Sequence, residues 1–246
     1  MDNRNKHSLF FVLLLSLSQV VISQEPVEPC VILLHGLART DRSLNKMGNE
    51  LAEEGYQVVN QGYASREHEI DYLAEDTLEK ALEQCSSDAQ ISFVTHSLGG
   101  ILVRFYLETN EIERLDRVVM LGPPNQGSQV VDEMRNVPGF ELLNGPAGLQ
   151  LGTDEESVPS TLGAVNFEVG VIAGTRTINP VLSTMLPNPD DGKVSVENTR
   201  VEGMADHISL PVSHALMMKN SEVIRQTIYF LKHGEFDHSD TEINLN

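Results

Sequence analysis

Short apolar runs alternate with longer amphipathic segments along most of this chain. The short runs are typical of buried strands and occupy residues 31–34, 56–60, 91–95, 117–121, 168–173 and 193–196. The longer segments are typical of helices and occupy residues 43–54, 69–85, 101–108 and 220–233. Strands that alternate with helices predict an α/β fold, with a mostly parallel central sheet flanked by helices on both faces.

The first residues have the features of a secretory signal peptide. Arg4 and Lys6 precede an apolar stretch over residues 9–22, and Ser23 is a small residue at the expected cleavage point. We predict that residues 1–23 are removed and that no stable membrane span remains. An uncleaved anchor is the alternative, although the apolar stretch is shorter than the roughly 18 residues that a spanning helix needs.

The remaining residues, 24–246, have the length of a single α/β domain. Residues 125–165 are rich in Gly and Pro and fit no periodic element, so they form either a lid or substrate-binding insertion or a plain surface excursion. Residues 234–246 are polar, and we expect a frayed tail from Gly234 onward. The net charge of −19 argues against nucleic acid, anionic membranes and polyanions as partners.

The two cysteines, Cys30 and Cys85, fall at corresponding places in the predicted sheet. Cys30 precedes the first strand, and Cys85 ends the helix that leads into the strand at 91–95. In a parallel sheet these points lie on the same edge, opposite the edge that carries active sites. In an exported protein we therefore predict a disulfide between them, with two free thiols as the alternative.

The strongest chemical signal is the segment Thr95-His96-Ser97-Leu98-Gly99-Gly100, between a buried strand and a helix. A serine on such a sharp turn projects its hydroxyl out of the fold, as in the nucleophile elbow of an α/β-hydrolase. To become a nucleophile, this serine needs a histidine as the base and an acid that orients the histidine. In this fold both follow the serine along the chain, the acid first and the histidine second.

We place the acid at Asp191, directly before Gly192, with Asp190 as the alternative. The base is His214, just before the last helix, and the alternative is His207 in the same predicted loop. His233 and His238 lie in or after the last helix and are expected to face solvent.

An oxyanion needs two backbone N–H donors. Leu98 follows the nucleophile, and Leu37 lies in the loop after the first strand, so these two residues are the predicted donors. His35 and His96 flank these positions, and we interpret both as bracing residues, because His35 precedes Ser97 in the chain and His96 points away from it.

Four motifs in this order resemble the bacterial lipase/esterase branch of the α/β-hydrolase superfamily. They are Leu33-Leu34-His35-Gly36-Leu37, the Ser97 segment, Leu121-Gly122-Pro123-Pro124-Asn125-Gln126-Gly127-Ser128 and Asp190-Asp191-Gly192-Lys193-Val194. The chain departs from the usual pattern at Thr95, where Gly or Ala is common, and at Asn125, where His is common. The resemblance implies ester hydrolysis by a Ser-Asp-His triad without a cofactor.

The sequence therefore predicts an exported, periplasmic or secreted, serine carboxylic-ester hydrolase for a small-molecule or lipid ester. An acyltransferase or lipid deacylase with the same triad is the alternative enzyme, and a binding module without catalysis is a third class. The spacing of Cys and His suggests no zinc site, and the chain has no Gly-rich phosphate loop. We expect no metal.

Overall fold

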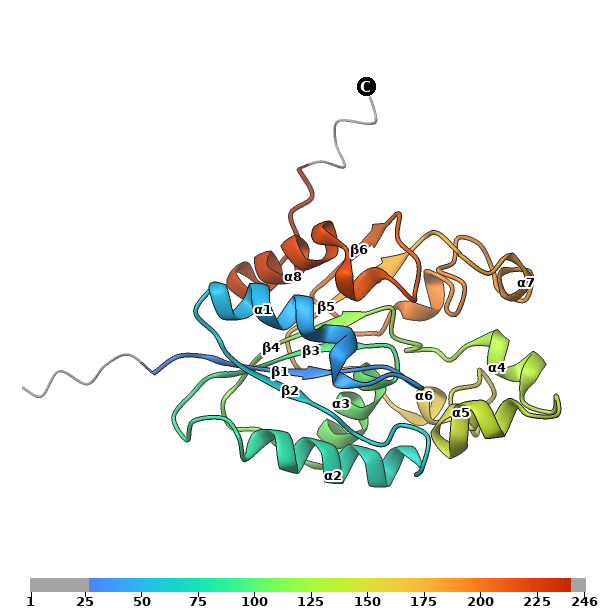
Figure 1. Cartoon of the computed structure of the whole chain (residues 1–246), viewed down its shortest axis with the longest axis horizontal. Helices are drawn as coiled ribbons and strands as arrows, with labels where there is room; N and C mark the ends of the chain where they lie inside the picture. Colours follow the sequence, from blue (N-terminus) through green and yellow to red (C-terminus); the bar gives the residue numbers. More distant parts are fainter. Residues whose placement is uncertain (1–26, 240–246) are drawn as a thin grey trace, which may run out of the picture.

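A six-stranded parallel sheet forms the centre of the molecule in the computed structural model, which describes residues 27–239 (Figure 1). Its strands lie in the order β2-β1-β3-β4-β5-β6, and all five neighbouring pairs are parallel. The strands are β1 (Cys30–Leu34), β2 (Gln57–Gln61), β3 (Ile91–His96), β4 (Leu115–Leu121), β5 (Val169–Gly174) and β6 (Asp206–Leu210). The predicted α/β fold is confirmed.

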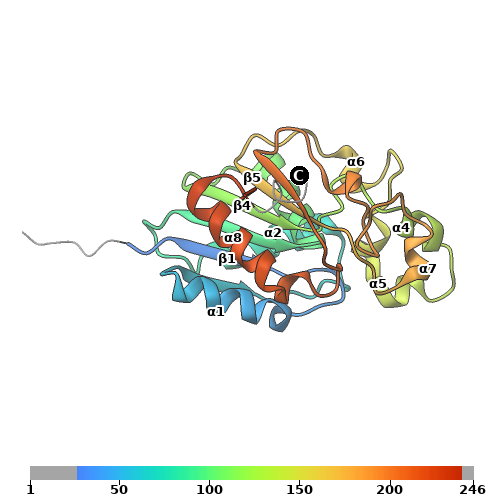
Figure 2. The ribbon, with the colours of Figure 1, turned by 90° about the horizontal axis from the view of Figure 1, so that it is seen from above.

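Helices cover both faces of the sheet (Figures 1 and 2). One face carries α2 (Ile70–Leu82) and α3 (Leu98–Thr109), and the other carries α1 (Asn45–Glu53) and α8 (Ser221–His233). Alternate residues of β1 divide between the two cores: Ile32 packs with α2 and α3, while Leu33 packs with α1 and α8. This alternation explains why the central strands are apolar without a break, because both faces of each strand are buried.

Two predicted strand assignments need correction. Residues 193–196 form no strand, because the backbone N–H groups of Lys193 and Val194 donate to the carboxylate of Asp191 instead of a neighbouring strand. Only a single antiparallel bridge, between Asp190 and Ser195, occurs there. The last strand is instead β6, in the segment that the sequence analysis assigned to a loop.

The region 125–165 contains three short helices, α4 (Gln129–Met134), α5 (Phe140–Leu149) and α6 (Val158–Thr161). Helix α5 is kinked at Gly145, whose backbone is not helical, and this kink removes the periodicity that a sequence search relies on. The remaining short elements are α7 (Pro180–Ser183), η1 (Asp41–Leu44), η2 (Glu197–Thr199) and η3 (Met217–Lys219). In both views α4, α5 and α7 lie at the same end of the molecule.

The predicted disulfide between Cys30 and Cys85 is present, with a Cα–Cα distance of 5.8 Å. Cys30 begins β1, and Cys85 lies in the turn after α2, so the bond joins the sheet to a helix of one face. The disulfide lies at the edge of the sheet where the parallel strands begin. The loops that follow β1 and β3 are at the opposite edge. A disulfide is typical of proteins in oxidising compartments.

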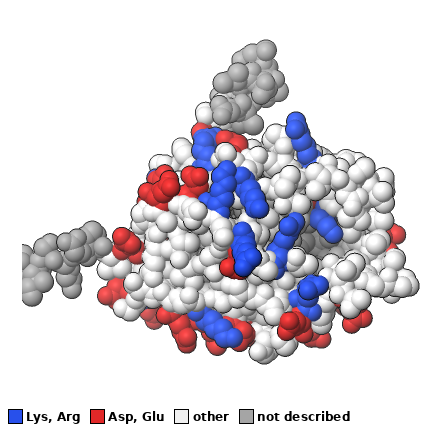
Figure 3. All heavy atoms as spheres, viewed as in Figure 1, with Lys and Arg blue, Asp and Glu red and all other residues white. Residues whose placement is uncertain are grey.

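Charge is unevenly distributed on the surface. On the face drawn in Figure 3, Lys and Arg side chains gather in the middle, whereas most of the visible Asp and Glu lie toward the edges. The chain as a whole carries a net charge of −19, so this basic area contrasts with the average of the surface.

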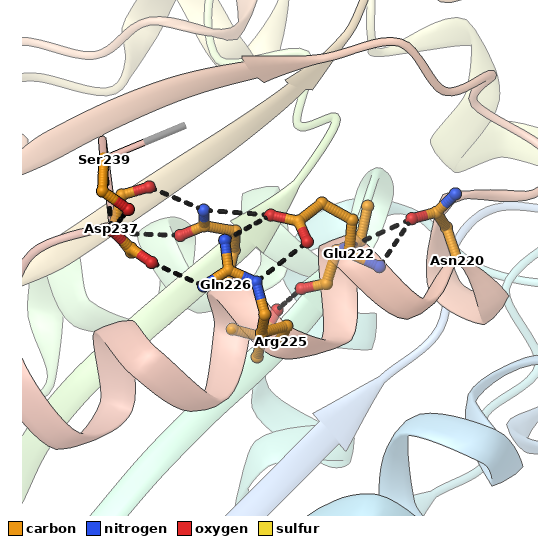
Figure 4. A network of polar contacts seen from close by, with 8 residues as sticks. Asn220, Glu222, Arg225, Gln226, Asp237 and Ser239 are labelled. Atoms are coloured by element: carbon orange, nitrogen blue, oxygen red, sulfur yellow. Dashed lines mark hydrogen bonds and ion pairs between the residues drawn. The ribbon is translucent and has the colours of Figure 1, made fainter. Parts of the chain in front are cut away.

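The segment after α8 is held in place as far as Ser239, contrary to the expected frayed tail from Gly234. Phe236 is buried, and its backbone N–H donates to Asp206. Figure 4 shows the polar network that fixes the following residues: Arg225 and Gln226 of α8 both bond to Asp237. Residues 240–246 and the predicted signal peptide, residues 1–23, lie outside the described residues. In the part of the chain that is described, no helix is long and apolar enough to cross a membrane.

Candidate active site

Ser97 occupies a sharp turn between β3 and α3. Its φ of 53° lies in the left-handed region, which residues with a side chain seldom adopt. The turn is held by the backbone N–H of Ser97, which donates to the carbonyl of Leu121 at 2.9 Å. It also needs Gly99, because a Cβ there would come within 2.6 Å of the carbonyl oxygen of Leu34. The turn therefore has the geometry of a nucleophile elbow.

Asp191, which is buried, pairs with His214, which is partly buried. The Nδ1 atom of His214 lies 2.7 Å from Oδ2 of Asp191, and the carboxylate is almost completely shielded from solvent. Its other oxygen accepts two backbone hydrogen bonds of 2.9 Å, from Lys193 and Val194. The backbone N–H of His214 also donates to the Asp191 carbonyl. These bonds fix the imidazole ring and assign the proton on Nδ1, which leaves Nε2 free to accept one.

The two alternative residues are placed differently. The carboxylate of Asp190 accepts from the Gly192 N–H and the Ser183 hydroxyl, so it holds its own loop. His207 belongs to β6, and the expectation that it lies in a loop is wrong. Its Nε2 is 3.0 Å from the Thr199 hydroxyl, and burial is the main reason why its pKa falls to about 4. The hydrogen bonds of these two side chains go to Ser183, Gly192 and Thr199, and none goes to Asp191 or His214 within residues 27–239.

The two predicted oxyanion donors lie at the ends of β1 and β3. Leu98 is the first residue of α3, where a helix leaves its N–H without a carbonyl partner. Leu37 follows β1, and its N–H makes no hydrogen bond among residues 27–239. The neighbouring Ala38 has a φ of 53°, and its N–H is taken by the Ser65 hydroxyl. The structure thus leaves two N–H groups next to the elbow.

The expected bracing roles of His35 and His96 match their contacts. The ring of His35 stacks on Tyr63 with ring centroids 4.1 Å apart, and its Nε2 accepts the Tyr63 N–H. Nε2 of His96 lies 3.0 Å from the carbonyl oxygen of His214. Burial lowers the pKa of both imidazoles, and that of His96 is well below its usual value.

Two glycines that the sequence analysis did not single out give the Asp191–His214 pair its space. A Cβ on Gly122 would lie 3.0 Å from Oδ2 of Asp191 and 3.1 Å from Nδ1 of His214. A Cβ on Gly174 would come within 2.7 Å of the Cβ of Asp191. Gly122 also has a φ of 54°, which only glycine adopts at low cost. Their positions, Gly122 directly after β4 and Gly174 as the last residue of β5, are the only signal in the sequence.

Ser97 and His214 line a common cavity of about 290 Å³. Part of its wall comes from the region 125–165, so this region is more than a surface excursion remote from Ser97. The hydroxyl of Ser97 makes no hydrogen bond among the described residues, and such bonds are often loose before substrate binds. The apolar lining residues are Leu37, Ala38, Pro124, Val130, Val131, Phe140, Leu151 and Val194.

The fold and the elbow define a class of protein. The chain belongs to the alpha/beta hydrolase fold family, whose model matches residues 29–154. It is similar in structure to the mature form of the lipase BlEst2 from Bacillus licheniformis, at 17% identity and a TM-score of 0.65, over 86% of this chain and 95% of that one.

Two further solved structures are similar over parts of longer chains. Lipase B from Aspergillus fumigatus shares 16% identity at a TM-score of 0.65, over 86% of this chain and 54% of that one. The phospholipase PlaB from Legionella pneumophila shares 16% identity at a TM-score of 0.58, over 77% and 53%. At such identities the likeness is one of fold. Comparison with curated proteins gave no match.

Proposed function

We propose that this protein is an exported serine carboxylic-ester hydrolase, similar to lipases and esterases, that acts through an acyl-enzyme on Ser97. The observation that carries the proposal is the 2.7 Å contact between the buried Asp191 and His214, because His214 lines the same cavity as a serine on a strained elbow. A hydroxyl becomes a useful nucleophile when a positioned imidazole takes its proton and the developing oxyanion meets fixed donors.

In the proposed reaction the Ser97 oxygen attacks the ester carbonyl carbon while Nε2 of His214 takes the hydroxyl proton. The N–H groups of Leu37 and Leu98 stabilise the oxyanion. The intermediate collapses, the bond to the alcohol oxygen breaks, and His214 returns its proton to the leaving alcohol. Water then attacks the acyl-enzyme with His214 again as the base, and the carboxylic acid leaves. Asp191 holds the ring and stabilises its charged form throughout.

The surroundings of the cavity favour an ester with an apolar part. Its wall is largely aliphatic, with the Phe140 ring added, as expected for a site that removes an acyl chain from water. Large exposed apolar side chains also gather nearby, on the α4–α5 segment and around α7. They are Val137, Leu142, Leu143, Ile178 and Val181.

The nucleophile is tested with a fluorophosphonate probe, which reacts with activated serines. The parent protein should be labelled and should hydrolyse short aryl esters. In Ser97→Ala labelling should disappear and turnover should fall by several orders of magnitude. Ser92→Ala is the matched control, because Ser92 is a buried serine of β3, the strand that leads to Ser97, and it does not line the cavity. Labelling retained in Ser97→Ala would overturn the assignment.

The acceptor of the acyl group is tested by product analysis. With water as the acceptor, the free acid is the product even when an alcohol is added. An acyltransferase or a lipid deacylase would differ, since the former forms a new ester with the added alcohol and the latter requires a lipid substrate. The disulfide supports an oxidising compartment, which agrees with export to the periplasm or the medium.

A further inference from the structure

The fixed charges that line the cavity beside Ser97 are both positive. Among the residues that line the cavity with Ser97, Arg39 and Lys193 carry a fixed charge, and no Asp or Glu takes part in the lining. This is unexpected in a chain that has 36 acidic and 17 basic residues. The two cations come from different walls: Arg39 follows the oxyanion loop after β1, and Lys193 follows the Asp191 loop.

Neither cation has an ion-pair partner in the part of the chain that the structure describes. Within residues 27–239, Arg39 and Lys193 have no carboxylate within ion-pair distance of their side chains. Loss of water contact lowers the pKa of the Lys193 ammonium, Asp191 opposes this, and the nearby charge of Arg39 adds to the lowering. The two positive charges are therefore close enough to repel each other.

Two like charges that line one cavity raise the free energy of the empty site. A negative group bound beside both cations offsets the repulsion and gains two attractive interactions. Both side chains are exposed, so solvent screening keeps each interaction modest. The rest of the chain is acidic on average, with 36 acidic and 17 basic residues in all, and it acts on an anion in the opposite sense. An extended polyanion would also meet the acidic surroundings, whereas a small molecule with one anionic group would not.

We infer that Arg39 and Lys193 are specificity-determining residues and that the preferred substrates are esters that carry an anionic group beside the scissile ester bond. The inference rests on the proposed ester hydrolysis and names the substrate class of the same site. The anion is held by Coulomb attraction in the bound ester, and the chemistry at Ser97 is unchanged.

Matched ester pairs test this inference and distinguish the two sides of the ester. The pair of 4-acetoxybenzoate and its methyl ester places the charge on the alcohol side. The pair of 4-nitrophenyl hydrogen adipate and its methyl ester places the charge on the acyl side. For each pair, kcat and KM are measured for the parent protein, Arg39→Gln, Lys193→Gln and the double variant. Differences in intrinsic reactivity cancel when each variant is compared with the parent on the same ester.

In at least one pair, the ratio of kcat/KM for the charged ester to that for the neutral ester should fall about 3- to 10-fold for each single variant, mainly through KM. The double variant should show a larger fall. In the parent the ratio should also fall as salt is raised from about 0.02 M to about 0.5 M. Arg42→Gln is the matched control, because it removes the same charge from an exposed position outside the cavity and should leave the ratio within about twofold.

The inference is overturned if the double variant keeps the parental ratio in both pairs, or if Arg42→Gln changes the ratio as much as the variants of the cavity do. Thermal melting must first show that the variants are folded. A result in which neutral esters are hydrolysed well and the ratios do not move contradicts the inference alone. Absence of hydrolysis of all four esters by the folded parent contradicts the proposed function, and the inference falls with it.

Discussion

The imidazole of His96 is hydrogen-bonded to the main chain of His214, with 3.0 Å between Nε2 and the carbonyl oxygen. Because a carbonyl only accepts, Nε2 of His96 carries the proton. The ring centroids of the two histidines are 4.7 Å apart. Burial keeps the pKa of His96 well below its usual value, so this ring stays neutral at the pH of an ester assay. His96 thus fixes the loop of the proposed base without competing for its proton.

We expect His214→Ala to lower kcat/KM for a short aryl ester by about 10⁴-fold or more, because the members of a triad act as a unit. His207→Ala removes a partly buried imidazole whose polar partner is Thr199, so we expect it to lower stability and to reduce activity by less than about tenfold. Steady-state kinetics on both variants, with thermal melting of each, provide the comparison. If His207→Ala were inactive and His214→Ala active, the base would be misassigned.

Substitutions of the two neighbouring acids, Asp191 and Asp190, should also differ in their effects on activity and stability. Asp191→Asn loses the carboxylate that holds Nδ1 of His214, and we expect kcat to fall by about 10⁴-fold. Asp190→Asn can keep only part of its bonds to Gly192 and Ser183. It should destabilise the protein by about 1–3 kcal/mol while most activity remains. Chemical denaturation measures the loss of stability, and kcat measures the loss of activity. If Asp190→Asn were as stable as the parent but had lost most of its kcat, the assignment of Asp191 as the acid would be contradicted.

The central strands were predictable because both their faces are buried, so each one is an unbroken apolar run. Strand β6 lies at the edge of the sheet and buries only Ile208 and Leu210 among its large apolar side chains, which is too weak a pattern to identify. The false strand at 193–196 has the opposite cause. Its two valines alternate as in a strand, but its backbone donors bond to the Asp191 side chain, a contact that no local pattern encodes.

The elbow motif nominated Ser97, and chain order then directed the search to an acid and a histidine after it, because both follow the nucleophile in this fold. It could not separate Asp191 from Asp190, since both stand in one turn and only the direction of each side chain differs. Gly122 and Gly174 are needed because a Cβ at either position would crowd Asp191, and at Gly122 also His214. These neighbours lie far along the chain from Gly122, so no local pattern shows the need for glycine there. The cationic lining arises in the same way, from two loops that meet only in the folded chain.

Removal of the disulfide should destabilise the fold without altering the site. Cys30 and Cys85 are 55 residues apart, and a loop of this length predicts a loss of about 2–5 kcal/mol in the free energy of unfolding. The double variant Cys30→Ser/Cys85→Ser should unfold at a lower denaturant concentration than the parent. Its kcat should be close to that of the parent at a temperature where it is folded. An unchanged midpoint, or a large fall in kcat with a native melting curve, would contradict this expectation.

The exposed apolar side chains of α5 should matter for esters that are presented at a lipid–water surface. Leu142 and Leu143 are 83% and 65% exposed, so replacement of both by Ser should change stability by less than about 1 kcal/mol. Each lost contact with an apolar phase weakens adsorption, because about 25 cal/mol is lost per Å² of apolar surface that would have been buried. We therefore expect turnover of an emulsified ester to fall several-fold while kcat/KM for a water-soluble short ester changes little. Val27→Ser is the control, since Val27 is also an exposed apolar residue but precedes β1 at the opposite edge of the sheet. Equal losses on both substrates in the double Ser variant would show that these leucines support the cavity and not adsorption.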